Sequence, residues 1–179
     1  MAKSSILLHC CCAPCASLAV ERLSPNHDIF LLFYNPNIRP RVEFDKRAAE
    51  LLKLLDSARY PGKVEVQIDS YDSEAFAEAA EKFHDEPEGG KRCRECFRIR
   101  LEKTAKLAKA QKRDYFATAL TVSPYKNAAV INEIGEEISR RQTVKYLASD
   151  FKKQDGYKRS IELSKMYGLY RQNYCGCAL

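Results

Sequence analysis

Short apolar runs alternate with segments of helical periodicity along the chain, and this alternation restricts the fold more than any other feature. We expect strands over residues 5–9, 29–34, 64–68, 115–120 and 144–147. We expect helices over residues 16–23, 42–55, 76–83, 93–112, 127–140 and 160–167. Strands joined by helices pair in parallel, so the sequence predicts an α/β fold of Rossmann-like or HUP-like type. It would have three layers, with a parallel sheet of about four to five strands between helices.

No internal repeat, low-complexity tract or Gly/Ser-rich linker divides the sequence. We therefore expect residues 1–179 to form a single domain. The apolar run at residues 6–8 is too short for a membrane span or a signal peptide. These features predict a cytoplasmic protein with no membrane partner.

Eight cysteines are the strongest signal in the composition, and they fall into three groups. Because thiols stay reduced in the cytosol, this number of cysteines indicates metal or redox chemistry rather than structural disulfides. The groups are Cys10-Cys11-Cys12 with Cys15, Cys93 with Cys96, and Cys175 with Cys177. The first group follows the first expected strand, at the sheet edge where parallel α/β proteins place their chemistry.

An adjacent pair of cysteines together with a C-x-x-C motif could hold either tetrahedral zinc or an iron–sulfur cluster. Adjacent ligands such as Cys11 and Cys12 suit the corners of a larger cluster better than one small ion, so the spacing favours iron–sulfur. Zinc, and thiols that bind no metal, remain alternatives.

Cys175 and Cys177 are separated by a single glycine. A disulfide across so short a ring would be strained and easily reduced, which suits a redox couple better than a structural bridge. The alternative is that these residues are two further metal ligands.

Charge is distributed unevenly along this chain of net charge +6. Residues 91–113 hold ten basic residues against two acidic ones, and residues 151–172 hold six against two. Both basic blocks adjoin cysteine motifs, which favours a phosphate-rich partner gripped near the reaction centre. Ordinary solvated helix faces are the alternative. No glycine-rich phosphate-binding loop follows the first strand, so we expect no nucleotide cofactor there. No cobalamin or flavin signature is evident, so we expect neither of those cofactors.

Long strings spread over the sequence resemble the epoxyqueuosine reductase QueH family, a cobalamin-independent, iron–sulfur family. The matching strings occur in the family's order and include Leu7 to Cys15, Asn35 to Ile38, Glu86 to Cys93, Cys96 to Leu101, Ser123-Pro124, Asp150 to Lys153, and Gly168 to Cys177.

The resemblance implies a [4Fe–4S] cluster bound by four cysteines, which here are Cys11, Cys12, Cys93 and Cys96. It also implies a redox-active pair at Cys175 and Cys177. Cys10 is expected to be a buried bystander. Cys15 is a candidate ligand of a mononuclear metal beside the cluster, with Cys12 or Cys177 as a second ligand of that metal.

The activity implied by the resemblance is reduction of epoxyqueuosine to queuosine at the tRNA wobble position, with electrons from an unidentified donor. The residues expected to meet tRNA phosphates include Arg92, Arg94, Arg98, Arg100, Lys152, Lys153 and Arg171. His9 is among the candidate proton donors, although a histidine at the end of a strand is more often a buried, hydrogen-bonded core residue. The alternatives are an iron–sulfur tRNA sulfur-transfer enzyme and a zinc-stabilised RNA-binding module.

Overall fold

A computed structural model describes residues 3–177 and contains a five-stranded, fully parallel sheet in the order β3-β2-β1-β4-β5. The predicted α/β class is confirmed. The strands are β1 (Ser4–His9), β2 (His27–Phe33), β3 (Val64–Ile68), β4 (Tyr115–Thr118) and β5 (Lys145–Tyr146).

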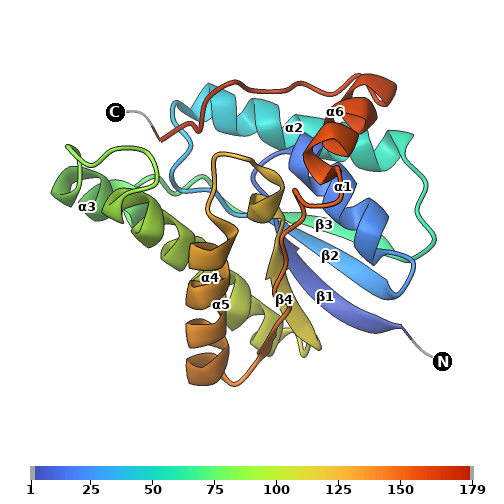
Figure 1. Ribbon diagram of the computed structural model, residues 1–179, viewed down its shortest axis with the longest axis horizontal. Helices are drawn as coiled ribbons and strands as arrows, with labels where there is room; N and C mark the ends of the chain where they lie inside the picture. Colours follow the sequence, from blue (N-terminus) through green and yellow to red (C-terminus); the bar gives the residue numbers. More distant parts are fainter. Residues whose placement is uncertain (1–2, 178–179) are drawn as a thin grey trace.

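Helices cover both faces of the sheet, giving three layers (Figure 1). One face carries α1 (Ala13–Leu23), α2 (Arg41–Ser57) and α6 (Gly156–Met166). The other carries α4 (Lys91–Ala110) and α5 (Ala128–Gln142), and α3 (Glu74–Lys82) packs against α4. No helix among residues 3–177 is both long enough and apolar enough to cross a bilayer.

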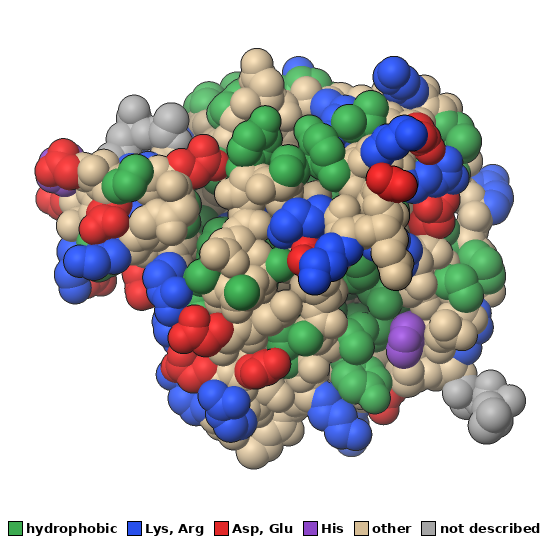
Figure 2. Space-filling model, in the orientation of Figure 1, with side chains coloured by type: hydrophobic (Ala, Val, Ile, Leu, Met, Phe, Trp, Pro, Cys, Tyr) green, Lys and Arg blue, Asp and Glu red, His purple; other side chains and the backbone are tan. Residues whose placement is uncertain are grey.

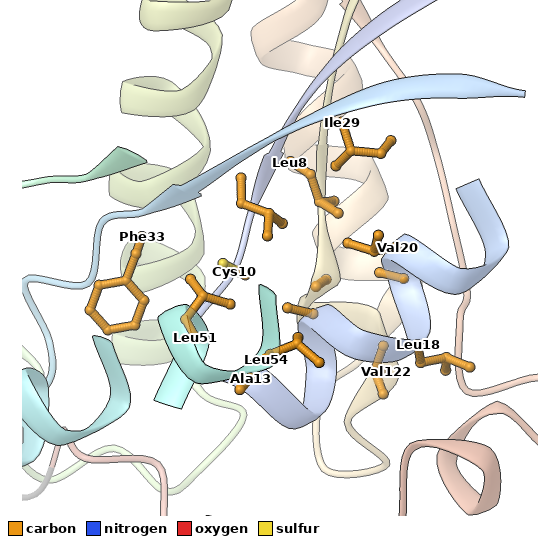
Figure 3. Close-up of a cluster of buried hydrophobic side chains, with 14 of the residues drawn as sticks. Leu8, Cys10, Ala13, Leu18, Val20, Ile29, Phe33, Leu51, Leu54 and Val122 are labelled. Carbon is orange, nitrogen blue, oxygen red and sulfur yellow. The ribbon is translucent and has the colours of Figure 1, made fainter. Parts of the chain in front are cut away.

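Alternation along β1 explains why the sheet is covered on both sides. Ile6 and Leu8 pack against α1 and α2, whereas Leu7 packs against α4 and α5. Cys10 continues the first set and is completely buried among apolar side chains (Figure 3). Burial raises the pKa of its thiol well above the usual range. Cys10 is therefore inert core, as expected of a bystander.

Several expected boundaries were wrong, and the errors lie near the cysteines. Helix α1 begins at Ala13 with a proline in its first turn, so Cys15 is helical instead of lying in a preceding turn. Helix α4 begins at Lys91, two residues before the expected start, and carries both Cys93 and Cys96.

Two further boundaries differ around the sheet edge. Strand β4 ends at Thr118, whose hydroxyl accepts a hydrogen bond from the backbone of Leu120 and so starts a 3₁₀ helix, η1 (Ala119–Val122). Helix α6 begins at Gly156, four residues before the expected start. A Cβ on Gly156 would lie 1.8 Å from the carbonyl oxygen of Phe151, so the close approach requires glycine there.

The strand order reverses between β1 and β4, because the chain winds outward from β1 in one direction and then returns to its other side. In open α/β sheets, ligands bind beyond the carboxyl ends of the strands at such a switch point. Here β1 leads into Cys10 to Cys12, and β4 leads into η1 and residues 123–127. The fold therefore places the first cysteine group at the expected ligand site.

Candidate thiol-lined active site

A cavity of about 310 Å³ lies at the switch point, lined by residues that follow β1 and β4 and by the C-terminal segment. Its buried floor includes Cys12, Asn37 and Arg47, each no more than 2% exposed. Its rim includes Tyr125 and Tyr174, which are 76% and 45% exposed. The cavity thus has polar side chains among its buried residues and exposed tyrosines at its rim.

Three cysteines stand together on the wall of this cavity. The Sγ atoms of Cys11, Cys12 and Cys15 all lie within 4.8 Å of one another, and those of Cys11 and Cys12 are 4.0 Å apart. Sulfur atoms around one tetrahedral zinc ion would be about 3.8 Å apart, given a Zn–S bond of about 2.3 Å. The group can therefore hold a metal ion, and Cys15 belongs to it.

A second cavity, of about 60 Å³, adjoins the first and is lined by the other cysteines. Cys93 and Cys96 come from α4, and Cys175 and Cys177 come from the C-terminal segment. Cys175 lines both cavities. The fold thus gathers seven of the eight cysteines around one region, although they are far apart in the sequence.

Arg100 and Lys126 place positive charge between the two sets of thiols, because both residues line both cavities. Arg100 is 1% exposed, and its Nε donates a hydrogen bond to the backbone oxygen of Cys96. Its Nη2 has no partner, and neither cation forms an ion pair with an acidic side chain within residues 3–177. Arg100, which we expect to meet tRNA phosphates near the cluster, therefore lies beside the thiols but is buried.

Buried positive charge is costly unless a negative group lies nearby, and here the neighbouring groups are cysteine thiols. Burial alone would lower the pKa of Arg100, but Cys96, Cys11, Cys175 and Cys177 together outweigh it and the pKa is raised. A metal–thiolate group is anionic and would supply the missing counter-charge. The donor set and its surroundings therefore fit an iron–sulfur or other metal–thiolate centre.

The thiols differ strongly in acidity. Hydrogen bonding from the Cys12 and Cys15 thiols holds the pKa of Cys11 well below its usual range. Hydrogen bonding from Cys177, followed by the charges of Lys126 and Arg100, lowers the pKa of Cys175 to about 6 against the effect of burial. The same hydrogen bond raises the pKa of Cys177. The Cys11–Cys12–Cys15 group and the Cys175–Cys177 pair thus each contain a thiolate beside a protonated thiol, which suits metal binding and redox chemistry.

Helix α2 holds the C-terminal segment in place. Arg47 donates hydrogen bonds to the carbonyl oxygens of Cys175, at 2.9 Å, and Tyr174, at 3.3 Å. The Arg47 guanidinium is itself fixed by Glu43, at 2.7 Å, in a buried ion pair. The backbone N–H of Arg39 donates to the carbonyl of Gly176, at 2.9 Å. These contacts fix the backbone on which the Cys175 thiol is carried.

Two of the arginines expected to bind tRNA lie at the contact between α4 and α5. Arg94 pairs with Glu133, at 3.3 Å, and Arg98 pairs with Glu137, at 2.9 Å. Acidic and basic side chains are interspersed over this part of the surface (Figure 2). Arg92 is nearer the thiols, since it lines the smaller cavity beside Cys93 and Cys96.

The other expected tRNA contacts lie on the α6 side. Lys152 and Lys153 are both within 4.0 Å of the Asp150 carboxylate. Arg171 lines the larger cavity, and its guanidinium donates to the hydroxyl of Ser164 and the backbone of Ser160. Arg171 thus stands at the cavity wall.

His9 is completely buried and hydrogen-bonds Thr118 Oγ1 and the backbone oxygen of Tyr34, each at 3.1 Å. Burial lowers its pKa to about 4, so the imidazole is neutral near pH 7. The core interpretation fits His9 better than a role as proton donor.

Sequence reasoning missed three residues of the site, namely Asn37, Arg47 and Lys126. Asn37 lies within a string that resembles the family, and Lys126 lies beside another. That position could have marked both residues as candidates for the site. Arg47 gave none, because nothing in the sequence of α2 links it to a segment about 130 residues later.

Comparison with known proteins agrees with the composition of the site. The family model described as epoxyqueuosine reductase QueH matches residues 6–179. An epoxyqueuosine reductase QueH of Streptococcus pyogenes is 43% identical over 98% of this chain and 69% of its own length. One of Thermotoga maritima is 35% identical over 97% of this chain and 88% of its own length.

Among solved structures, a predicted subunit of a tRNA methyltransferase from Methanocaldococcus jannaschii superposes with a TM-score of 0.55 at 16% identity. The match covers 90% of this chain and 74% of that one, and it supports the fold alone. The family match and the curated relatives span nearly the whole sequence, cysteine groups included. This chain belongs to the epoxyqueuosine reductase QueH family.

Proposed function

We propose that this protein reduces epoxyqueuosine to queuosine at the wobble position of tRNA, the last step of queuosine biosynthesis. The observation that carries the proposal is a cavity walled by cysteine thiols, at the ligand-binding edge of the sheet in a chain of this family. We take residues 1–179 to act as a single reductase domain in the cytoplasm.

The reaction removes one oxygen atom from an epoxide and leaves an alkene and water, which requires two electrons and two protons. Oxidation of the Cys175 and Cys177 pair to a disulfide supplies both electrons. Because Cys175 is already a thiolate, the pair supplies one proton, from Cys177, and water supplies the second. An external electron donor must then reduce the disulfide before the next turnover. The lowered pKa of Cys175, at about 6, supplies the thiolate, while Cys177 retains a proton for the leaving oxygen.

Cys11, Cys12, Cys93 and Cys96 would hold the [4Fe–4S] cluster, with Arg100 and Lys126 as its counter-charges. When bound, such a cluster supplies single electrons at a potential set by its surroundings. Cys15 would complete the site of an adjacent mononuclear metal by sharing Cys12, and the 4.8 Å grouping supports this pairing over one with Cys177.

We further propose that the tRNA lies across the cavity mouth, so that only the modified base enters. Arg92 and Arg171 line the cavities and would meet the nucleotides nearest the reacting group. Arg94, Arg98, Lys152 and Lys153 would grip phosphates further out, exchanging their present carboxylate partners for phosphate oxygens.

The test is anaerobic purification with iron, sulfide and zinc analysis, followed by incubation of the protein with dithionite and tRNA containing epoxyqueuosine. Nucleoside mass spectrometry should show queuosine. A colourless zinc protein without activity would indicate the RNA-binding module, and a product that has gained sulfur would indicate sulfur transfer.

Cysteine variants sharpen this test. Cys11→Ser and Cys93→Ser should each lose iron together with activity. Cys10→Ala is the matched control, because Cys10 follows β1 beside Cys11 but is buried in the apolar core. It should keep both iron and turnover. Iron loss in Cys10→Ala, or full iron retention in the other two, would contradict the assigned ligands.

A further inference from the structure

Asn37 is a buried amide that lines the larger cavity without a hydrogen-bond partner. It is 1% exposed, and its Oδ1 lies buried with no donor in reach within residues 3–177. Folded proteins pair nearly all buried polar groups, because an unpaired one costs free energy. Such a group on a cavity wall indicates a ligand that completes it.

The exposed fractions of the lining residues indicate which part of a ligand reaches Asn37. Cys11 and Cys12 are 8% and 1% exposed and lie on the inner side with Asn37, whereas Tyr125, at 76%, marks the opening. A volume of about 310 Å³ admits one base and its substituent but no polynucleotide. A group that reacts at the thiols must therefore enter first and come to lie on the floor.

Two buried acceptors on the cavity wall lack a donor within the described residues. Arg47 and Arg100 are both buried there and offer only N–H groups. Asn37 Oδ1 is the buried free acceptor on the floor, and the Oε1 atom of Gln172 is a second unpaired acceptor on the cavity wall. A ligand group that carries hydroxyl donors beside its reacting atoms would match this arrangement.

Resting on the proposed function, we propose that Asn37 is a specificity-determining residue that accepts a hydrogen bond from a hydroxyl of the substrate's cyclopentane ring. That ring carries the epoxide, and it is absent from an unmodified guanosine. Asn37 thereby distinguishes the modified wobble nucleoside from guanosine and orients the epoxide toward the thiols. The rest of the tRNA stays at the rim and does not depend on Asn37.

The first measurement is the ratio of Kd values for two tRNAs that differ only at the wobble position, one with epoxyqueuosine and one with guanosine. Asn37→Ala should weaken binding of the first by on the order of 10- to 100-fold and leave the second unchanged. If the wild-type protein shows no preference, the proposed function fails. If wild type shows the preference and Asn37→Ala keeps it, the role of Asn37 fails.

The second measurement separates recognition from a structural role. Asn37 Oδ1 accepts no hydrogen bond within residues 3–177, so Asn37→Ala and the similarly sized Asn37→Leu should keep or raise the Tm. Asn132→Ala is the control, since Asn132 bonds Tyr146 and the backbone of Ser149. It should lower the Tm and leave the tRNA preference unchanged. A lower Tm in both Asn37 variants would overturn the proposal.

Discussion

Arg47→Met should be strongly destabilising, because it removes one partner of a buried ion pair. Arg47 and Glu43 have side chains only 2% and 8% exposed, with Nε and Oε1 2.7 Å apart. The change leaves the Glu43 carboxylate buried without its cation and frees the carbonyl oxygens of Cys175 and Tyr174. Removing one member of a buried pair costs about 3–5 kcal/mol, a large share of a typical unfolding free energy.

The same helix provides a matched control. Arg41 and Asp45 have the same i,i+4 spacing, with the charged atoms 3.3 Å apart, but their side chains are 70% and 56% exposed. Arg41→Met should therefore cost no more than about 0.5 kcal/mol. Urea unfolding of wild type and both variants gives the free energies directly.

A second readout concerns the C-terminal segment itself. Without Arg47 the backbone of Cys175 loses its hydrogen bonds to α2, so iodoacetamide should modify Cys175 faster than in wild type or in Arg41→Met. The reasoning is refuted if Arg47→Met costs no more than Arg41→Met, or if Cys175 reacts at the same rate in both variants.

Four further predictions follow from single contacts. In metal-free protein, alkylation of Cys175 should reach half its maximal rate near pH 6, since its pKa is lowered to about 6, and a midpoint near 9 would exclude the assigned environment. Because the pKa of His9 is lowered to about 4 from 6.5, the unfolded chain binds the proton better. The contribution of neutral His9 to the free energy of unfolding is therefore complete above pH 6.5 and should fall by about 3 kcal/mol by pH 4. Urea titrations at the two pH values should show this loss in wild type and not in His9→Leu. Gly135→Ala would place a Cβ 2.4 Å from the ring of Tyr146, so thermal unfolding should show a loss of about 1–3 kcal/mol, whereas unchanged stability would mean that the ring moves freely. Arg98→Glu should weaken tRNA binding and reduce the salt dependence of log Kd by about one unit or more, and an unchanged slope would remove Arg98 from the interface.

The sequence predicts the frame of the site because strand periodicity and cysteine position act together. Once the first strand is placed, parallel pairing puts Cys11 and Cys12 at the edge where ligands bind, whatever the rest of the chain does. The family resemblance then joins Cys93, Cys96 and the C-terminal pair to that edge. The structure groups these residues around two adjoining cavities.

The charged residues were harder to place, since periodicity does not tell which arginine of a cationic helix turns inward. Arg100 lies between Phe97 and Leu101 on the buried face of α4, although arginine is rarely buried. The counter-charges that make its burial tolerable are thiols from other elements. Arg47 and Asn37 depend in the same way on contacts and cavities that exist only in the folded chain.

The most direct test of the account is a single turnover with excess pre-reduced, anaerobic protein and tRNA containing epoxyqueuosine, with no added reductant. Mass spectrometry should find queuosine in the tRNA and, in equal amount, a disulfide between Cys175 and Cys177. Queuosine formed while both thiols stay reduced would contradict the role of the pair. No queuosine from iron-loaded, dithiol protein would contradict the proposed function itself.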